Sequence, residues 1–346
     1  MKAIDIQSLA RENVKRLRPY SSARDDFKGI ATVFLDANEN PFPNGYNRYP
    51  DPHQSVLKEA IAKIKRVLPD QIFLGNGSDE PIDLLLRTFC EPAEDNVIVP
   101  QPTYGMYGIS AEINNVEVIP TKLNHEFDLD TSAVLHVVKP KTKLIFICSP
   151  NNPSGNLLDE KKIETLLKSF SGIVVIDEAY IDFADSESWT TKLSQFKNLV
   201  VLQTFSKAWG LASLRLGMCF GNTEIIMLLN KIKPPYNINA FTQSEVLKSL
   251  LHGEQEKDRM VAIIRHEREN LGKKLAEIPK VKKIHPSHAN FLLVEVTDAS
   301  QIYNQLVSKG IIVRDRSKII LCDNCLRITV GTAEENNQLI QAMQLL

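Results

Sequence analysis

Three short apolar runs place the strongest constraint on the fold of this chain. They occupy residues 144–148, 173–176 and 199–202 and consist of apolar side chains. Runs of this kind are typical of strands that are buried on both faces of a parallel sheet. A stretch with helical periodicity, residues 159–169, separates the first two runs. This alternation predicts a layered α/β fold with a mostly parallel central sheet.

Further elements continue this alternation on either side of the three runs. Helices are predicted over residues 55–67 and 82–89, with more helices between 222 and about 280, and strands over 72–74, 96–99 and 116–119. The C-terminal part reads as a smaller α+β lobe. Its predicted elements are strands 291–296, 311–313 and 326–330 and helices 300–309 and 333–345.

The pattern also predicts how the chain divides into domains. Residues 1 to about 30 are charged and irregular, which indicates an arm rather than a core element. We predict that residues 1–45 form an N-terminal arm and part of the small domain. Residues 46–245 would form the large domain, and residues 246–346 the small C-terminal domain.

The composition is typical of a soluble globular protein. Of the 346 residues, 43% are hydrophobic and 24% are charged, and the formal net charge is −1. Because Lys and Arg are not in excess, we expect no nucleic-acid partner. No apolar run approaches the roughly 20 residues that span a bilayer, and the first residues lack an apolar signal core. We therefore expect a cytoplasmic protein without a membrane partner.

The five cysteines are odd in number and scattered, which favours reduced thiols over a disulfide framework. Cys322 and Cys325 form a lone C-x-x-C, for which a redox or zinc role is a weak alternative to a turn before the strand at 326–330. His285 and His288 form an H-x-x-H without a carboxylate partner of the zinc-enzyme type. We interpret both motifs as structural and predict no metal site.

Lys207 is the most informative single residue. It follows the apolar run at 199–202, where burial can lower the pKa of its amine and make it a nucleophile toward a carbonyl. The hydroxyls of Thr204 and Ser206, together with Arg215, would supply donors for an anion beside it. A surface lysine at a strand end is the alternative for any one lysine. An amine beside a phosphate site is what the cofactor pyridoxal 5'-phosphate (PLP) requires.

Two more strand ends carry polar residues that could contact the same cofactor. Ligands of open α/β sheets bind at the carboxyl ends of the strands, where these residues lie. Residues 75–80 join a strand to a helix, and backbone N–H groups there would face an anion. Taken alone, these residues are better explained by a simple N-cap at Ser78 or Asp79. Residues 149–155 follow a buried strand, and Asn152 within them could donate to a phenolic oxygen.

Asp177 ends the apolar run at 173–176, so its carboxylate needs a cationic partner. A protonated pyridine nitrogen is such a partner, and Tyr180 could reach an oxygen of the same ring. An equally good explanation, for this segment alone, is a carboxylate bound to the backbone N–H groups of the following turn.

The order of these strand-end elements resembles the fold-type I PLP-dependent aminotransferases across essentially the whole chain. Within that group, the sequence is similar to the histidinol-phosphate aminotransferase family. The segments that carry the resemblance are residues 35–41, 48–51, 149–153, 177–180, 204–207 and 326–332. Two places depart from the family pattern: Ser213 stands where glycine is usual, and residues 43–46 shorten the loop before Arg48. Neither touches a predicted contact with the cofactor.

The resemblance implies a role for each strand-end residue. Lys207 is the catalytic residue, which bonds to the cofactor and moves a proton between it and the substrate α-carbon. Asp177 pairs with the pyridinium nitrogen, while Asn152 and Tyr180 hydrogen-bond to the phenolic oxygen. Tyr104 stacks on the ring.

The resemblance also implies the phosphate and substrate sites. The cofactor phosphate is held by Ser78, Asp79, Thr204, Ser206, Arg215 and, from a second subunit of a homodimer, Tyr49. The predicted substrate contacts are Tyr20, Asn38, Tyr49, Arg314 and Arg327. Arg327 would bind the distal anion of the substrate, since arginine binds phosphate in a bidentate manner.

The implied reaction transfers an amino group between histidinol phosphate and 2-oxoglutarate, giving imidazole acetol phosphate and glutamate, in histidine biosynthesis. Three alternatives stay open on the sequence: an aromatic or broad-specificity aminotransferase, a threonine-phosphate decarboxylase, and a nonenzymatic ligand-binding protein that retains the fold.

Overall fold

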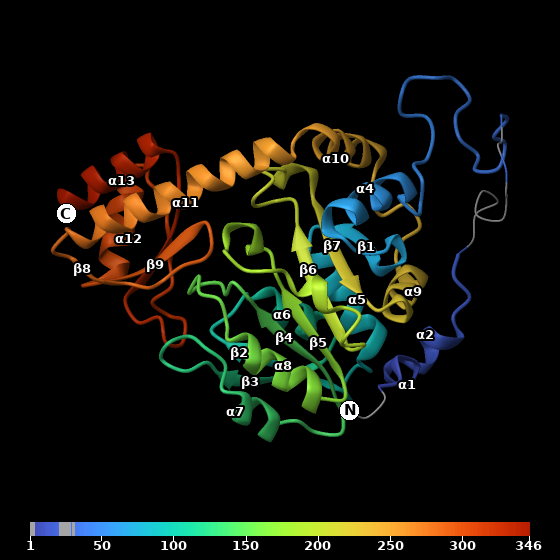
Figure 1. Ribbon diagram of the computed structural model, residues 1–346, viewed down its shortest axis with the longest axis horizontal. Coiled ribbons are helices and arrows are strands. Elements are labelled where there is room, and N and C mark those ends of the chain that lie inside the picture. The colour runs from blue at the N-terminus through green and yellow to red at the C-terminus, as the bar shows by residue number, and fades with distance from the viewer. Residues whose placement is uncertain (1–3, 21–28, 30–31) are drawn as a thin grey trace.

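The computed structural model describes residues 4–20, 29 and 32–346. Its centre is a seven-stranded sheet with strand order β1-β7-β6-β5-β4-β2-β3 (Figure 1). The strands are β1 (Ile72–Asn76), β2 (Asn96–Gln101), β3 (Glu117–Lys122), β4 (Thr142–Cys148), β5 (Ile173–Asp177), β6 (Leu199–Thr204) and β7 (Leu216–Gly221). Of these, β7 pairs antiparallel with both of its neighbours, and the others share one direction. The predicted mostly parallel sheet is confirmed.

The apolar runs of the central strands fill a core on each face of this sheet, because successive side chains of a strand point to opposite faces. One core receives Ile145, Ile147, Val174, Ile176 and Val201, and the opposite core receives Leu144, Phe146, Val175, Val200 and Leu202. Burying an aliphatic side chain of this size stabilises a fold by about 1.5–3 kcal/mol relative to leaving it exposed. The central strands are therefore a rigid base for the residues at their ends.

Helices cover both faces of the sheet (Figure 1). On one face lie α4 (Ser55–Lys65), α7 (Thr131–His136), α8 (Glu160–Ser169) and α10 (Ala240–His252). On the other face lie α5 (Asp79–Phe89), α6 (Met106–Ile113) and α9 (Thr223–Ile232). The predicted α/β class is thereby confirmed.

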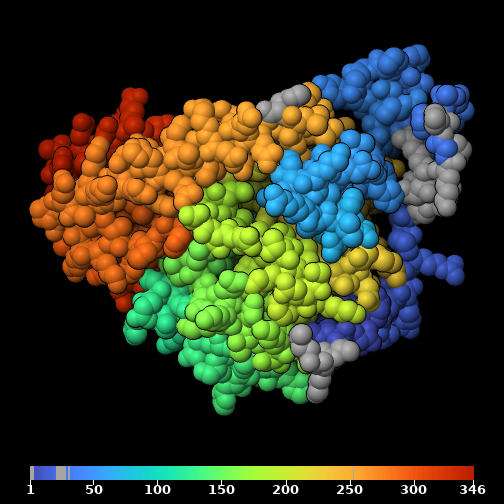
Figure 2. Space-filling view, viewed as in Figure 1, coloured from blue at the N-terminus to red at the C-terminus, as the bar shows by residue number. Residues whose placement is uncertain are grey.

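The C-terminal lobe has its own antiparallel sheet, with strand order β10-β11-β9-β8. Its strands are β8 (Val281–Ile284), β9 (Phe291–Val296), β10 (Arg314–Asp315) and β11 (Cys325–Thr329). A separate core lies between one face of this sheet and helices α11 (Glu254–Ala276), α12 (Ala299–Ser308) and α13 (Ala333–Gln344). Helix α11 extends from the large lobe to the small one, and the orange and red lobe lies against the green part of the large lobe (Figure 2).

The described N-terminal residues include two short helices, α1 (Ile6–Leu9) and α2 (Glu12–Arg16). Ile6, Ala10 and Val14 bury their side chains in the core beneath α5 and α9. The prediction of an irregular segment over residues 1–30 is therefore wrong for these helices, which contribute to the core. Residues 1–3, 21–28 and 30–31 of the predicted arm lie outside the described residues. The domain limits at residues 45 and 245 stay predictions.

The structure also bears on the predicted strand at 311–313, on the cysteines and on His285. The strand expected at residues 311–313 is wrong, because pairing with β11 begins only at Arg314. All five cysteines are buried free thiols, and Cys322 and Cys325 bound the turn that leads into β11, as predicted. His285 contacts the ring of Phe127 edge-on, at 5.1 Å between centroids.

Two features are absent from the described ranges. None of their helices is long and apolar enough to span a bilayer. No group of three His, Cys, Asp or Glu side chains in these ranges is arranged to hold a metal ion.

Candidate active site

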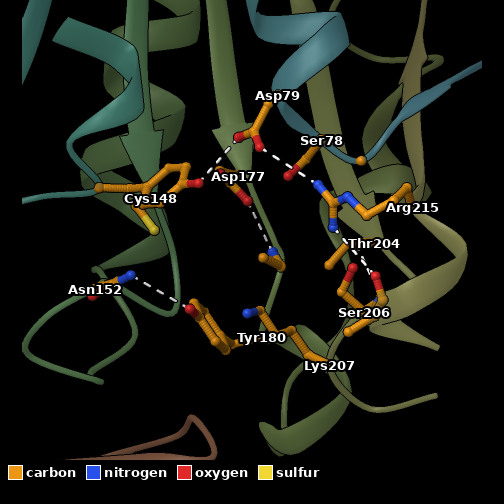
Figure 3. Close-up of a pocket in the computed structure, with 14 residues that line it drawn as sticks. Ser78, Asp79, Cys148, Asn152, Asp177, Tyr180, Thr204, Ser206, Lys207 and Arg215 are labelled. Atoms are coloured by element: carbon orange, nitrogen blue, oxygen red, sulfur yellow. Dashed lines mark hydrogen bonds and ion pairs between the residues drawn. The ribbon is translucent and has the colours of Figure 1, made fainter. Parts of the chain in front are cut away.

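A pocket opens where β4, β5 and β6 end (Figure 3). The strand register sets its floor, because Cys148 on β4 lies opposite Asp177 on β5. The residues that line it are Gly77, Ser78, Asp79, Tyr104, Cys148, Asn152, Asp177, Ala179, Tyr180, Thr204, Ser206, Lys207, Ala212 and Arg215. Every residue predicted to contact the cofactor, apart from Tyr49, therefore lies at this one pocket.

Asp177 carries a carboxylate that is almost fully buried, at 2% exposure. Its Oδ2 accepts a hydrogen bond from the Tyr107 hydroxyl at 2.7 Å, and its Oδ1 accepts one from the backbone N–H of Ala179 at 3.0 Å. Burial raises the pKa of Asp177 to about 6, although both hydrogen bonds oppose the rise. A cation placed against this carboxylate would restore its ordinary acidity.

Tyr107 is a functional candidate that the sequence reasoning missed. It lies on α6, is fully buried, and stacks on Phe146 of β4 with 5.1 Å between ring centroids and an interplanar angle of 8°. Burial raises its pKa well above the ordinary value, so its hydroxyl stays a donor to Asp177. The available signal was its position three residues after the predicted ring-stacking residue Tyr104.

Lys207 follows β6 and projects into the pocket, where it remains open to solvent (Figure 3). Its Nζ lies 5.8 Å from the centroid of the Tyr180 ring. Partial burial lowers the pKa of this amine, and the positive charge of Arg327 lowers it further. A lysine in this setting gives up its proton more readily than one on the surface.

The opposite wall of the pocket is built to receive an anion. Helix α5 begins there with Ser78 as its N-cap, and its first N–H groups have no partner within the helix. Gly77 has φ +68°, and a Cβ at this position would lie 2.5 Å from Nη2 of Arg215. Arg215 also lies 3.8 Å from a carboxylate oxygen of Asp79, measured from Nη2.

The two side chains assigned to a phenolic oxygen lie next to each other. Nδ2 of Asn152 donates to the Tyr180 hydroxyl at 3.4 Å. Oδ1 of the same amide accepts from Nη1 of Arg327 at 2.6 Å. Because burial raises the pKa of Tyr180, its hydroxyl stays protonated and can also donate. Arg327 comes from β11 of the small lobe, with Arg314 opposite it on β10.

Tyr20, Asn38 and Tyr49 are not brought to this pocket within one chain. Tyr20 is 70% exposed. Tyr49 stacks on Tyr236, with 4.4 Å between ring centroids, and shares a second surface pocket with Asn38. Residues 32–50 lie at the end of the molecule opposite the C-terminal lobe (Figures 1 and 2). The substrate and phosphate roles of these three residues stay predictions.

The arrangement combines an amine, a buried carboxylate and an anion cradle at the ends of parallel strands, which defines a site for a charged cofactor. The aminotransferase class I and II family matches residues 29–343 of the chain. The chain belongs to this family.

Curated relatives narrow the assignment within the family. A protein from Christiangramia forsetii, named histidinol-phosphate aminotransferase, is 55% identical over 346 residues that cover 99% of both chains. Further relatives at 52% and 55% identity carry the same name. The predicted resemblance to histidinol-phosphate aminotransferases is therefore confirmed.

Solved structures show the same fold. The histidinol-phosphate aminotransferase from Sinorhizobium meliloti, crystallised with PLP, matches with a TM-score of 0.79 at 22% identity, over 86% of this chain and 82% of that chain. L-threonine-O-3-phosphate decarboxylase from Porphyromonas gingivalis matches with a TM-score of 0.72 at 22% identity, over 86% and 90%. Because aminotransferases and a decarboxylase share this fold, the reaction has to be argued from the site.

Proposed function

We propose that this protein is a PLP-dependent aminotransferase that moves the amino group of histidinol phosphate to 2-oxoglutarate, giving imidazole acetol phosphate and glutamate. The observation that carries the proposal is the buried Asp177 carboxylate beside the Lys207 amine, at the ends of the neighbouring strands β5 and β6. The names of the full-length relatives support the substrate and, with it, a role in histidine biosynthesis.

The residues of the pocket fit PLP group by group. Asp177 offers a buried negative charge to a protonated ring nitrogen, and such a cation would lower the pKa that burial raises to about 6. The N-terminus of α5 and the guanidinium of Arg215 offer donors to a phosphate. Gly77 leaves free the space between them that a Cβ would fill. Asn152 and Tyr180 offer donors to a phenolic oxygen.

Each of these side chains contributes to the transfer of the amino group. Bound PLP supplies the electron sink that stabilises negative charge at the substrate α-carbon. Nζ of Lys207 accepts the proton from that carbon and returns it, which its lowered pKa favours. The charge of Asp177 would keep the ring nitrogen protonated, Tyr104 would stack on the ring, and Tyr180 would donate to its phenolic oxygen.

The substrate end of the pocket is positively charged. Arg327 and Arg314 face each other across the β10–β11 pair, and Arg327 already contacts the pocket through Asn152. A phosphate group needs such a pair, because each guanidinium offers two parallel donors to its oxygens. This charge supports histidinol phosphate over an aromatic amino acid, whose only anionic group is a singly charged α-carboxylate.

We further propose a cytoplasmic homodimer, in which Tyr49 of one subunit reaches the phosphate site of the other. Residues 32–50 support this assembly because they expose large apolar side chains: Val33, Leu35, Phe42 and Tyr46 are each more than 70% exposed. An apolar surface of this extent is typical of an interface between chains. Light scattering on purified protein tests the proposal, and a monomer at micromolar concentration would contradict it.

A half-reaction tests the proposed activity. Histidinol phosphate added to the PLP-loaded protein, without a keto acid, should convert the cofactor absorbance to that of the pyridoxamine form. Adding 2-oxoglutarate should restore it, and Lys207→Ala should abolish both changes. Stronger conversion by phenylalanine would favour an aromatic aminotransferase. Release of carbon dioxide from threonine phosphate would favour a decarboxylase, and bound PLP without any turnover would favour a nonenzymatic role.

A further inference from the structure

A third arginine shares the face of the small sheet that carries Arg314 and Arg327. Arg314 is the direct cross-strand partner of Arg327. The backbone N–H of Arg316 donates to the carbonyl of Cys325 at 2.8 Å, which extends the same ladder by one residue beyond Asp315. Residues two apart on a strand, and residues directly opposite on neighbouring strands, point to the same face. Arg314, Arg316 and Arg327 therefore emerge on one side.

That side faces the active site. Arg327 reaches Asn152 in the pocket, whereas its strand neighbours Leu326 and Ile328 point the other way into the core of the small lobe. Cys325 lies on the same side as Arg327 and packs in a core of the large lobe. Arg316, opposite Cys325, is thus directed to the boundary between the two lobes.

The charge on this face is not balanced within the described part of the chain. Nε of Arg316 is buried and has no hydrogen-bond partner there. Asp315 lies between Arg314 and Arg316, but its carboxylate accepts instead from Ser300 and Ser317. Glu295 on β9 shares the face but lies two strands from Arg316, which corresponds to about 10 Å.

The three arginines also act on one another. Burial lowers the pKa of Arg316, and the charges of Arg327 and Arg314 lower it further. Like charges on directly opposed strand positions destabilise a sheet. The side chain of Arg316 is half-buried, and its buried Nε without a hydrogen-bond partner costs additional stability. A ligand that brings two negative charges to this face would relieve both effects, and a single carboxylate would relieve less.

We propose that Arg316 is a third arginine of the subsite for the distal anion of the substrate, and that it selects a doubly charged phosphate over a carboxylate. This inference rests on the proposed function, since it concerns the same substrate site. Arg316 would contribute to substrate binding and specificity. The chemical step itself would be carried out by the residues around Lys207.

The experiment compares wild-type holoenzyme with Arg316→Gln and with Lys318→Gln as matched control. Lys318 is exposed on the turn that follows Arg316, so its substitution removes the same charge from the same hairpin. The measurements are kcat and KM for histidinol phosphate and for phenylalanine. A further readout, independent of turnover, is the Tm of the holoenzyme with and without inorganic phosphate.

Arg316→Gln should raise the KM for histidinol phosphate by about 10- to 100-fold and change kcat by less than about twofold, the pattern of lost uniform binding. The KM for phenylalanine should rise less, and the Tm increase caused by inorganic phosphate should shrink. Without ligand, the Tm should equal or exceed that of the wild type, because a half-buried charge whose Nε lacks a hydrogen-bond partner has been removed. Arg316→Lys should recover part of the affinity, and Lys318→Gln should resemble the wild type.

Three outcomes would overturn the inference. An unchanged KM with a lowered Tm, or a variant that fails to fold, would make Arg316 a structural residue. Equal losses for both substrates would remove its role in selecting phosphate. A similar loss of affinity for histidinol phosphate in Lys318→Gln would show that the effect comes from the net charge of the hairpin and not from a contact of Arg316. A wild-type protein that does not transaminate histidinol phosphate would instead contradict the proposed function itself.

Discussion

Arg327 on the small lobe donates to Oδ1 of Asn152 on the large lobe at 2.6 Å, while Nδ2 of the same amide donates to Tyr180. One asparagine therefore links the arginine that we assign to the substrate to the hydroxyl that we assign to the cofactor. The contact also joins the two lobes directly at the pocket. A movement of β11 would therefore displace this amide or break its hydrogen bond with Arg327.

The contact predicts how substitutions of Arg327 behave. Arg327→Gln removes the charge and should raise the KM for histidinol phosphate by about 100-fold, because a charge-assisted bidentate pair is lost. Arg327→Lys retains the charge but not the two parallel donors, so its KM should lie between that of Arg327→Gln and the wild type. Steady-state kinetics on the three proteins measure the effect. Equal KM values would show that Arg327 does not bind the substrate anion.

The hydrogen bond from Tyr107 predicts the titration of Asp177. Because this bond stabilises the ionised carboxylate, Tyr107→Phe should raise the pKa of Asp177 above its value of about 6, by roughly one unit. If PLP binding requires ionised Asp177, acidification should weaken it in both proteins. In Tyr107→Phe the loss of binding should begin at a higher pH than in the wild type. Fluorescence titration of PLP across pH 5–8 measures the midpoint. Asp177→Asn should lack this midpoint, and an unmoved midpoint in Tyr107→Phe would contradict the assignment.

The sequence predicted those parts of the site that follow uninterrupted apolar strands. Asp177 directly follows one such run and Lys207 lies shortly after another, so their meeting at the sheet edge could be expected from strand direction alone. Strand β7 was missed because Gly217 and Gly221 interrupt its apolar pattern, and glycine is depleted in strands. Gly217 is nevertheless required, since a Cβ there would lie 2.2 Å from the backbone of Gly77.

Tyr107 and Arg316 escaped prediction for different physical reasons. Helix α6, which positions Tyr107, contains Gly108, and a glycine inside a helix weakens the helical pattern. The importance of Arg316 depends on which face of β10 it occupies and on the absence of a partner within the described residues. That information resides in the register of the β10–β11 pair, which residue order alone does not determine.

Burial of Glu178, the neighbour of Asp177, leads us to expect that the free energy of unfolding depends on pH. Its carboxylate is 1% exposed and accepts from Ser188, Trp189 and Gln203. Burial raises its pKa from 4.5 to about 7. Between these values the folded state binds more protons than the unfolded state, so this group lowers the free energy of unfolding as pH rises through the window.

Glu178→Gln removes this titration but leaves the other groups in place. The difference in free energy of unfolding between variant and wild type should therefore shift in favour of the variant by on the order of 3 kcal/mol between pH 4.5 and 7. Hydrogen bonds lost by the substitution add a constant that does not depend on pH. Urea unfolding of the cofactor-free proteins at several pH values measures the slope, and parallel profiles would contradict the raised pKa.

A substitution of Gly77 tests the phosphate site, because it can distinguish a steric clash with Arg215 from the effect of backbone strain. Gly77→Ala places a Cβ 2.5 Å from Nη2 of Arg215 and should raise the Kd for PLP by about tenfold, because Arg215 has to move away from the phosphate. Gly210→Ala is the matched control: its φ of +67° is almost the same as the +68° of Gly77, but a Cβ there meets no atom within 4 Å. Both variants should lose about 1 kcal/mol of stability from the left-handed backbone. Only Gly77→Ala should lose PLP affinity, and an equal rise in Kd for both would assign the effect to strain and not to Arg215.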